Sequence, residues 1–268
     1  MINNEKYLNL LTYLKKLERV VLAFSGGVDS TFLLKAAKEA LGDNLKAVTI
    51  QSPYIPKWEI AEAKELVAKL GIDFEIVEAP IIDEIRNNPE NRCYLCKKAV
   101  FSQIKAIAAR EGYRYVIDGT NFDDIGDYRP GLAALEELNI KSPLLECRLK
   151  KQEIRDLSKE LGLATWDKPP YACLLTRIPY GNELKEEDFI KIEKAEKYMM
   201  DIGFRAVRVR CHGNLARIEV DKNDKSRLFN EVLLEQISAK LKEFGFQYVT
   251  LDLEGYRMGS FNETLGTK

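Results

Sequence analysis

Short hydrophobic runs recur through the first two-thirds of the chain, and stretches with helical spacing separate them. The predicted strands, which read as buried, cover residues 19–24, 45–50, 74–77 and 115–117. The predicted helices cover residues 30–41, 58–70 and 94–111, each followed by a glycine where helices commonly end. Strands that alternate with helices predict an α/β fold with a parallel sheet and helices on both faces.

The pattern changes after about residue 178. A charged helix is predicted over 186–200 and another over 224–243. The predicted strands cover residues 204–210, 216–220 and 247–253. This order favours a smaller C-terminal α+β domain with a ferredoxin-like sheet. We therefore expect two domains, over residues 1–178 and 179–268.

Composition and charge narrow the class of protein. The 268 residues carry a formal net charge of −1, which does not indicate general nucleic-acid binding and favours a small-molecule substrate. No apolar run approaches the roughly 20 residues that span a bilayer. The first residues lead into an amphipathic helix rather than a signal peptide. These features predict a cytoplasmic protein without a membrane partner.

The most informative segment is 25–30, which reads Ser-Gly-Gly-Val-Asp-Ser between a predicted strand and a predicted helix. Adjacent glycines let the backbone approach a ligand, and the helix N-terminus presents N–H groups and a positive dipole end. Ser25 and Ser30 add hydroxyl donors. Asp29 would repel phosphates unless a cation lay between them, which points to Mg²⁺. The segment therefore predicts an anion cradle.

The chain has five cysteines and a single histidine. An odd number of cysteines in a reducing compartment argues for metal or redox chemistry rather than disulfides. Cys93 and Cys96 have the CxxC spacing that lets two thiolates reach one metal. The pair also fits a redox pair or a chance occurrence at a helix start. A zinc site would take further ligands from Cys147, Cys173, Cys211 or His212.

Residues 25–30 resemble the pyrophosphate loop of the PP-loop ATPases, the N-type ATP pyrophosphatases. The resemblance implies an adenine nucleotide alpha hydrolase-like domain that cleaves ATP between its α and β phosphates and adenylates an oxygen of its substrate. It makes Asp29 the partner of Mg²⁺-pyrophosphate. We expect the ATP site at the carboxyl ends of the strands. Its residues would be Ser25, Gly26, Gly27, Asp29, Ser30, Ser52, Gly119 and Thr120, with Asp127 and Arg129 near the α-phosphate. An ordinary turn at Gly119 and a helix-capping role for Arg129 are the alternatives.

Further segments make the whole chain resemble the LarE family. They cover residues 127–131, 168–181, 207–210 and 248–257. The resemblance implies a sulfurtransferase that adenylates a carboxylate of pyridinium-3,5-biscarboxylic acid mononucleotide and converts it into a thiocarboxylate. This reaction belongs to the synthesis of the nickel-pincer nucleotide cofactor, and it releases AMP and pyrophosphate.

Cys173 matches the position at which one branch of this family sacrifices a cysteine sulfur and retains dehydroalanine. The additional Cys93 and Cys96 resemble the other branch, in which three cysteines hold a 4Fe–4S cluster. That resemblance implies that Cys93, Cys96 and Cys173 are cluster ligands in the first domain, and that a sulfide on the remaining iron is transferred. Sacrifice of Cys173 is the alternative. The sequence does not identify the sulfide or persulfide donor.

A substrate with phosphate and carboxylate groups needs cations. Arg208 and Arg210 alternate with valines, which puts both guanidinium groups on one strand face. A solvated strand face would give the same pattern, but the resemblance implies that both arginines bind the substrate phosphate. It also implies substrate contacts for Thr176, Arg177 and Glu196, although a solvated helix carboxylate explains Glu196 as well.

Two other functions fit part of the pattern. A PP-loop tRNA thiolase with a three-cysteine cluster would show a basic surface, which the near-neutral charge does not support. A non-catalytic nucleotide-binding protein with structural zinc would have little use for Asp29. The resemblance further implies a homo-oligomer, such as a hexamer, with 179–268 as the substrate-binding and oligomerisation domain.

Overall fold

Two compact units make up the computed structural model, which describes residues 2, 4–126, 130–257 and 259–261. The first unit comprises Met1–Ile85 and Asn91–Tyr171, and the second comprises Arg86–Glu90 and Ala172–Lys268. Residues 172–178, which the sequence pattern assigns to the first domain, lie in the second unit. One reason is Asn88, whose side-chain amide donates to the carbonyls of Ile178 at 2.7 Å and Pro179 at 3.0 Å.

In the described part of the first unit, four parallel strands form one sheet in the order β3-β2-β1-β4. They are β1 (Val20–Ala23), β2 (Leu45–Gln51), β3 (Asp73–Glu78) and β4 (Tyr115–Ile117). Leu22 of β1 lies opposite Ala47 of β2 and Ile117 of β4. A bridge from Ile117 to Lys141 extends the sheet beyond β4. The parallel sheet confirms the predicted α/β class.

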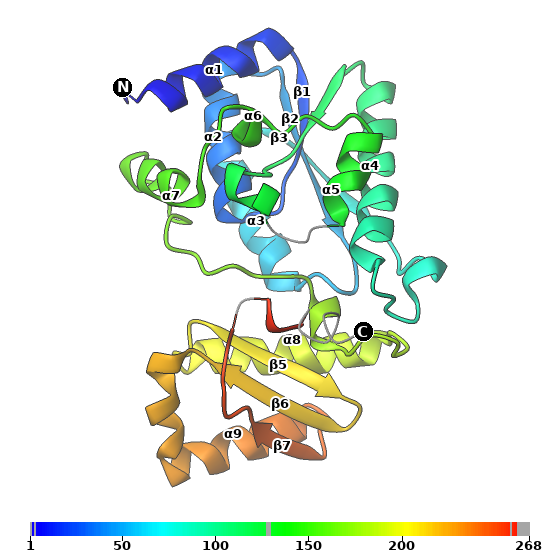
Figure 1. The fold of residues 1–268 in the computed structure, drawn as a ribbon, viewed down its shortest axis with the longest axis vertical. Helices are drawn as coiled ribbons and strands as arrows, with labels where there is room; N and C mark the ends of the chain where they lie inside the picture. The colour runs from blue at the N-terminus through cyan, green and yellow to red at the C-terminus, as the bar shows by residue number, and fades with distance from the viewer. Residues whose placement is uncertain (1, 3, 127–129, 258, 262–268) are drawn as a thin grey trace. The chain divides into compact units, whose positions relative to one another are not determined.

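Helices cover both faces of this sheet (Figure 1). One face is covered by α4 (Arg92–Arg110) and α5 (Gly131–Glu137). The other face carries α1 (Glu5–Leu17), α2 (Val28–Leu41), α3 (Lys57–Lys69), α6 (Pro143–Glu146) and α7 (Lys151–Glu160). Short 3-10 turns occur at η1 (Asp83–Ile85) and η2 (Phe122–Gly126). In the part of the chain that is described, no helix is long and apolar enough to cross a membrane.

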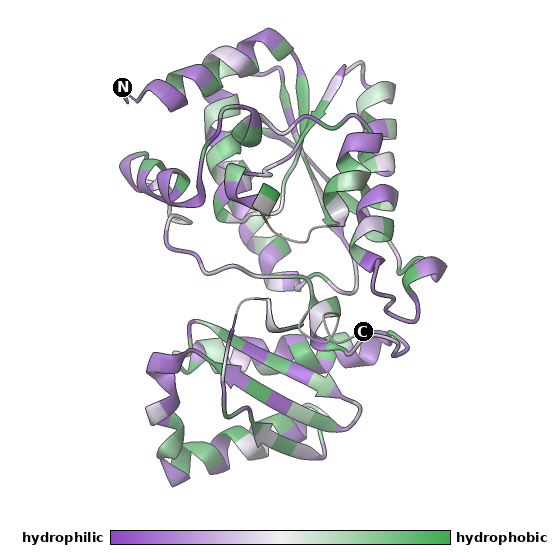
Figure 2. Ribbon diagram, viewed as in Figure 1, coloured by the Kyte–Doolittle hydropathy of each residue, from purple (hydrophilic) through white to green (hydrophobic). Residues whose placement is uncertain are grey.

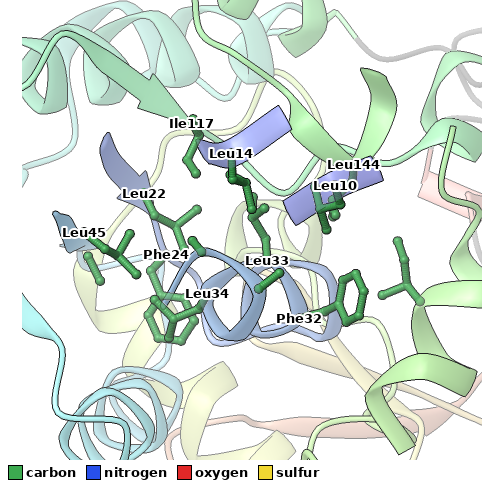
Figure 3. Packing of buried hydrophobic residues seen from close by; sticks show 14 of the residues in the cluster. Leu10, Leu14, Leu22, Phe24, Phe32, Leu33, Leu34, Leu45, Ile117 and Leu144 are labelled. Atoms are coloured by element: carbon green, nitrogen blue, oxygen red, sulfur yellow. The ribbon is translucent and has the colours of Figure 1, made fainter. Parts of the chain in front are cut away.

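The buried side chains form a cluster on each face. On the α2 face, one cluster includes Leu22 of β1, Leu14 of α1 and Phe32 of α2, all fully buried (Figure 3). Val21, the neighbour of Leu22, joins the opposite cluster with Val116 of β4. Successive side chains of a strand point to opposite faces, so a strand covered on both sides is hydrophobic throughout. The hydropathy of β1 follows this rule (Figure 2).

The strand order places a ligand-binding edge in the first unit. The chain runs from β1 through β2 to β3 on one side, and β4 lies on the other side of β1. In parallel sheets, ligands bind beyond the carboxyl ends of the strands at the point where the order reverses. The loops that follow β1 and β4 meet this condition, and residues 25–30 begin in the first of them.

In the described part of the second unit, three strands form a mixed sheet in the order β5-β6-β7. β5 and β6 are antiparallel, whereas β6 and β7 are parallel. The expected smaller α+β domain is confirmed, but the ferredoxin-like topology is wrong. Parallel neighbours need a crossover connection, which η4 and α9 provide here. The elements are η3 (Leu174–Arg177), α8 (Glu186–Asp201), β5 (Val207–His212), β6 (Leu215–Val220), η4 (Lys222–Phe229), α9 (Glu231–Glu243) and β7 (Tyr248–Leu251).

The helix predicted over 224–243 is divided in two. Asn230 separates η4 from α9, and its side chain accepts a hydrogen bond from the amide of Leu233 at 3.0 Å. Asparagine is a favoured N-cap because it satisfies an amide that has no partner within the helix. The α-helix therefore begins after Asn230.

Candidate active site

Residues 25–30 join β1 to α2 through a tight turn. Gly26 has a φ of 71°, a left-handed conformation that glycine adopts without strain. A Cβ atom on Gly26 would lie 3.4 Å from the Cβ atom of Ala63, so the loop packs closely against α3. Gly27 is the N-cap of α2, whose first-turn amides lie just beyond the loop. This arrangement can hold an anion.

Hydroxyl groups brace the turn. Ser25 Oγ lies 3.0 Å from Ser30 Oγ, and the Ser30 hydroxyl donates to the Gly27 carbonyl at 3.2 Å. The Thr49 hydroxyl of β2 donates to the Phe24 carbonyl at 2.7 Å. The loop is thus shaped before a ligand arrives, and each serine can exchange its internal hydrogen bond for one to a phosphate.

The loop after β4 packs against the start of α2. A Cβ atom on Gly119 would lie 3.0 Å from the backbone nitrogen of Ser30, which is closer than side chains normally approach. The Thr120 hydroxyl donates to Asp118 Oδ2 at 2.5 Å, and the Ser142 hydroxyl donates to Asp118 Oδ1 at 2.6 Å. Gly119 and Thr120 therefore shape the wall beside the turn.

Asp29 pairs with a residue outside the motif. Lys151 Nζ, at the start of α7, lies 2.5 Å from Asp29 Oδ2. Burial raises the pKa of Asp29 and Asp124 adds to this, whereas Lys151 and Arg155 oppose the shift. Among the described residues, the buried Asp29 Oδ1 has no hydrogen-bond partner. A carboxylate oxygen in this state suits Mg²⁺, which prefers oxygen ligands.

Ser52 follows β2 at the same edge of the sheet. Its side chain is buried, and its hydroxyl has no hydrogen-bond partner within the described chain. It can therefore hydrogen-bond a ligand. Asp127 and Arg129, the other predicted nucleotide contacts, lie outside the described residues.

Cys93 and Cys96 lie one helical turn apart at the start of α4. Cys93 is exposed, and Cys96 is partly buried with its sulfur 3.2 Å from the Tyr54 hydroxyl. Burial raises the pKa of Cys96, and the hydrogen bond with Tyr54 opposes this. Tyr54 belongs to the loop after β2, so this contact ties the CxxC pair to the ligand-binding edge. The spacing of the thiols suits two ligands of one metal centre.

Cys173, the third predicted ligand, precedes η3 in the second unit. Among the described residues, no group of three or more histidine, cysteine, aspartate and glutamate side chains is placed to hold a metal ion. A three-cysteine site therefore stays a prediction. Cys147 packs against the core of the first unit, and Cys211 is buried in β5.

A buried ion pair joins Arg177 to Glu196 of α8. Arg177 Nε and Nη2 donate to the two carboxylate oxygens at 2.8 and 2.9 Å. The amide of Val209 donates to Glu196 at 2.9 Å. Burial alone would raise the pKa of Glu196, but Arg177 holds it below its ordinary value. Glu196, only 4% exposed, is thus not a solvated helix carboxylate.

The same arginine holds the backbone around Cys173. Arg177 Nη1 donates to the carbonyls of Ala172 at 3.0 Å and Cys173 at 3.4 Å. It also donates to the Thr176 hydroxyl at 2.7 Å, which in turn donates to the Cys173 carbonyl at 3.1 Å. Thr176 and Arg177, expected as substrate contacts, here fix the cysteine segment.

Arg208 and Arg210 share one face of β5 and are buried rather than solvated. Arg210 forms a bidentate pair with Glu219 of β6, with both distances 2.8 Å. The Arg208 guanidinium lies 4.9 Å from the ring centre of Tyr256. Burial lowers the pKa of Arg208, and the positive charge of Arg177 lowers it further. Clustered arginines of this kind favour an anionic ligand.

A cavity of about 330 Å³ lies within the second unit. Its lining includes Arg177, Arg210 and the single histidine, His212, but among the described residues it does not include Arg208. Its other charged residues are Arg217, Glu219, Asp252, Glu254 and Arg257. The His212 side chain is exposed at the end of β5, but partial desolvation still lowers its pKa, and the charges of Arg217 and Arg210 add to this. Within the lining, Arg210 pairs with Glu219, Arg217 pairs with Asp252 and Arg257 pairs with Glu254, so an anion bound here would share these arginines with carboxylates.

Three side chains that the sequence pattern does not single out contact the predicted site residues. They are Tyr54, Lys151 and Lys168. Lys168 Nζ donates to the Gly26 carbonyl at 3.2 Å and to Glu62 at 2.7 Å. Only the positions of two of these residues could have pointed to them. Tyr54 lies in the loop after a predicted strand, and Lys168 begins one of the segments that resemble the LarE family. No signal pointed to Lys151, whose partner is 122 residues away.

Comparisons with known proteins agree with this architecture. The family model described as NAD synthase matches residues 3–110, which include the PP-loop and the CxxC pair. A glutamine-hydrolysing GMP synthase from Aeropyrum pernix is 29% identical, covering 59% of this chain and 35% of the relative. These similarities and the fold define a PP-loop enzyme that uses ATP.

Several relatives match almost the whole chain. A pyridinium-3,5-bisthiocarboxylic acid mononucleotide synthase from Lactiplantibacillus plantarum is 39% identical, over 97% of this chain and 95% of the relative. An uncharacterised protein from Synechocystis is 42% identical, over 96% of this chain and 97% of the relative. The chain therefore belongs to the LarE family. Membership supports an ATP-utilising sulfurtransferase that works with ATP and Mg²⁺.

Proposed function

We propose that this protein converts a carboxylate of pyridinium-3,5-biscarboxylic acid mononucleotide into a thiocarboxylate, with formation of AMP and pyrophosphate. The reaction would serve the synthesis of the nickel-pincer nucleotide cofactor. The observation that carries the proposal is the similarity to the Lactiplantibacillus plantarum synthase along 97% of the chain. The anion-binding turn with Asp29 at the start of α2 supports it independently.

In the first step, a substrate carboxylate oxygen bonds to the α-phosphorus of ATP. The bond from that phosphorus to the bridging oxygen breaks, and the electron pair leaves with pyrophosphate. Backbone amides of the turn and the first turn of α2 would hold the phosphates, and Asp29 would hold Mg²⁺. When bound, Mg²⁺ supplies neutralisation of the pyrophosphate charge. The attacking carboxylate is already ionised, so no histidine base is required.

The nucleotide contacts that we propose surround this turn. Ser25, Ser30 and the two glycines would bind the β and γ phosphates, and Ser52 would approach the adenosine. Gly119 and Thr120 form the neighbouring wall. Asp127 and Arg129 stay proposals near the α-phosphate, since they lie outside the described residues.

For the mononucleotide we propose the arginine-rich face of the second unit. Arg208 and Arg210 would bind its phosphate, and the cavity lined by Arg210 offers room for it. Thr176, Arg177 and Glu196 would act beside the substrate and hold the Cys173 backbone. Bidentate guanidinium groups match the geometry of a phosphate.

For the sulfur we propose a 4Fe–4S cluster held by Cys93, Cys96 and Cys173. The donor chemistry fits, because Cys93 and Cys96 lie one turn apart on α4 and thiolates are the usual ligands of such clusters. With three protein ligands, one iron would be able to supply a sulfide. The acyl carbon of the adenylate would then form a bond to that sulfur, and its bond to the AMP oxygen would break, with the electron pair leaving on AMP. Sacrifice of the Cys173 sulfur is the competing source.

Anaerobic purification followed by iron, sulfide and zinc analysis tests the cluster. We expect about four irons per chain, as in a 4Fe–4S protein, and a loss of iron in Cys173→Ala. Cys147→Ala is the matched control, because Cys147 packs against the core and should not affect iron content. Stoichiometric zinc without iron would refute the cluster and favour a structural zinc protein.

The reaction is tested by following pyrophosphate release and thiocarboxylate formation with the mononucleotide. Cys173→Ala should abolish sulfur transfer and leave pyrophosphate release largely intact. Equal loss of both would mean that Cys173 is structural. A single turnover that leaves dehydroalanine at Cys173 would favour sacrifice, and thiolation of tRNA would favour the thiolase alternative.

We also propose that the protein is cytoplasmic and forms a homo-oligomer through the domain at 179–268. The support is the family resemblance, which implies an assembly such as a hexamer. Sedimentation velocity of the full chain tests the assembly. A monomer at micromolar concentration would contradict it.

A further inference from the structure

The ion pair between Lys151 and Asp29 carries an inference that rests on the proposed function. Lys151 Nζ lies 2.5 Å from Asp29 Oδ2, and the side chains are 34% and 23% exposed. Asp29 belongs to the first turn of α2, and Lys151 is the first residue of α7. A full positive charge thus contacts the carboxylate that the PP-loop motif contributes.

The start of α7 is held in place independently of Asp29. The backbone amide of Lys151 donates to Asp123 Oδ2 at 2.8 Å. Glu153 closes the first turn of α7, with its carboxylate accepting from the Lys150 amide at 2.8 Å. Because the backbone is anchored, the flexible Lys151 side chain can change partner without moving the helix.

Only one of the two carboxylate oxygens of Asp29 has a hydrogen-bond partner among the described residues. Oδ2 accepts from Lys151, whereas the buried Oδ1 has no hydrogen-bond partner among the described residues. The other charged groups that act on Asp29 are Asp124, which disfavours its ionised form, and Arg155, which favours it. A buried carboxylate oxygen without a partner is unfavourable, and a cation would relieve this.

We propose that Lys151 is a placeholder cation, which neutralises Asp29 in the empty enzyme and moves to the ATP phosphates when Mg²⁺ takes its place on Asp29. Mg²⁺ and an ammonium group compete for the same carboxylate, so the empty site discriminates against free Mg²⁺. An arriving MgATP brings its own cation together with phosphate oxygens that accept from Lys151. Lys151 then stabilises the pyrophosphate as it leaves with the electron pair of the broken bond to the α-phosphorus.

This exchange predicts opposite effects of one substitution on two ligands. Lys151→Met removes the competitor, so free Mn²⁺, used as a probe for Mg²⁺, should bind roughly tenfold more tightly, the size expected from one adjacent opposite charge. The same change removes a phosphate contact, so pyrophosphate should bind more weakly. If Lys151 had only a structural role, its substitution would weaken the binding of both ligands or of neither.

The experiment measures Mn²⁺ binding by electron paramagnetic resonance and pyrophosphate binding by calorimetry, with the full chain free of nucleotide. Lys151→Arg keeps the charge and should resemble the wild type in Mn²⁺ affinity, and Asp29→Asn should lose Mn²⁺ binding. Lys159→Met is the matched control, since Lys159 is an exposed lysine near the other end of α7. If Lys151→Met does not fold, Lys151→Gln is read by the same two titrations.

The outcomes separate this inference from the proposed function. Unchanged or weaker Mn²⁺ binding in folded Lys151→Met would overturn the placeholder role, even if the wild type catalyses ATP–pyrophosphate exchange. If the wild type does not catalyse ATP–pyrophosphate exchange in the presence of the mononucleotide, the proposed function is overturned instead. Tighter Mn²⁺ binding together with weaker pyrophosphate binding supports the exchange of partners.

Discussion

Gly119 lies so close to the backbone of Ser30 that a Cβ atom on Gly119 would be 3.0 Å from the Ser30 nitrogen. The contact joins the loop after β4 to the first turn of α2. These two segments follow adjacent strands on either side of the point where the strand order reverses. The first-turn amides of α2 therefore depend on the size of a residue in another loop.

Gly119→Ala should weaken ATP binding, because the added methyl group must displace the start of α2 by a few tenths of an ångström. Overpacking of this kind costs about 1–3 kcal/mol, and we expect part of it to appear as a higher Kd for ATP. Calorimetric titration with ATP and a thermal melt measure the two effects. Gly71→Ala is the control, because Gly71 also has a positive φ. The substitution should lower stability at a place far from the turn and leave ATP binding unchanged. ATP affinity equal to that of the wild type would contradict the close contact.

Glu196→Gln should destabilise the second unit strongly. It removes the carboxylate charge that faces the Arg177 guanidinium, which is 1% exposed. Breaking a buried pair on one side costs about 3–5 kcal/mol, and urea denaturation measures this. Asp201→Asn breaks an exposed pair with Lys197 on the same helix and should cost at most about 1 kcal/mol. Equal effects of the two substitutions would show that the buried pair contributes little.

His212 should report an anion in the cavity. Partial desolvation and the charges of Arg217 and Arg210 hold its pKa below the ordinary value of 6.5, because they disfavour the protonated ring. A bound anion favours the protonated ring, so inorganic phosphate should raise the pKa, and Arg217→Met should raise it without phosphate. The single histidine gives one imidazole to follow in an NMR titration.

Arg227→Met is the control variant for the His212 titration. Among the described residues, Arg227 is not part of the cavity lining. That substitution should leave the imidazole titration as it is in the wild type. A pKa that neither phosphate nor Arg217→Met changes would argue against anion binding beside His212.

Cys211 should be the slowest cysteine to react with iodoacetamide. Burial raises its pKa to about 12, and Asp188 adds to the shift. The thiolate is the reactive form, so almost none is present at pH 8. Cys93 is exposed and should react first in metal-free protein, as followed by mass spectrometry. Urea-unfolded protein should label at every cysteine, and native labelling of Cys211 as fast as Cys93 would refute its burial.

The local elements were predictable because their signals are local. The predicted strand at 45–50 ends one residue before β2, and the predicted helix at 58–70 is shifted by one residue from α3. Hydrophobic spacing marks both elements, and a following glycine marks the end of the helix. The ferredoxin-like topology failed for the opposite reason. The strand at 247–253 has the same pattern whether it pairs parallel or antiparallel, and only packing with β6 decides this.

The sequence by itself determined the class of the first unit, the anion-binding turn and the family, because each depends on residues that are adjacent or repeat along the chain. Only the tertiary structure decided the partners of those residues. Lys151 reaches Asp29 across 122 positions, and Glu196 is buried against Arg177 rather than exposed on its helix. Charge pairing and burial arise between elements that fold together, so no local pattern contains them.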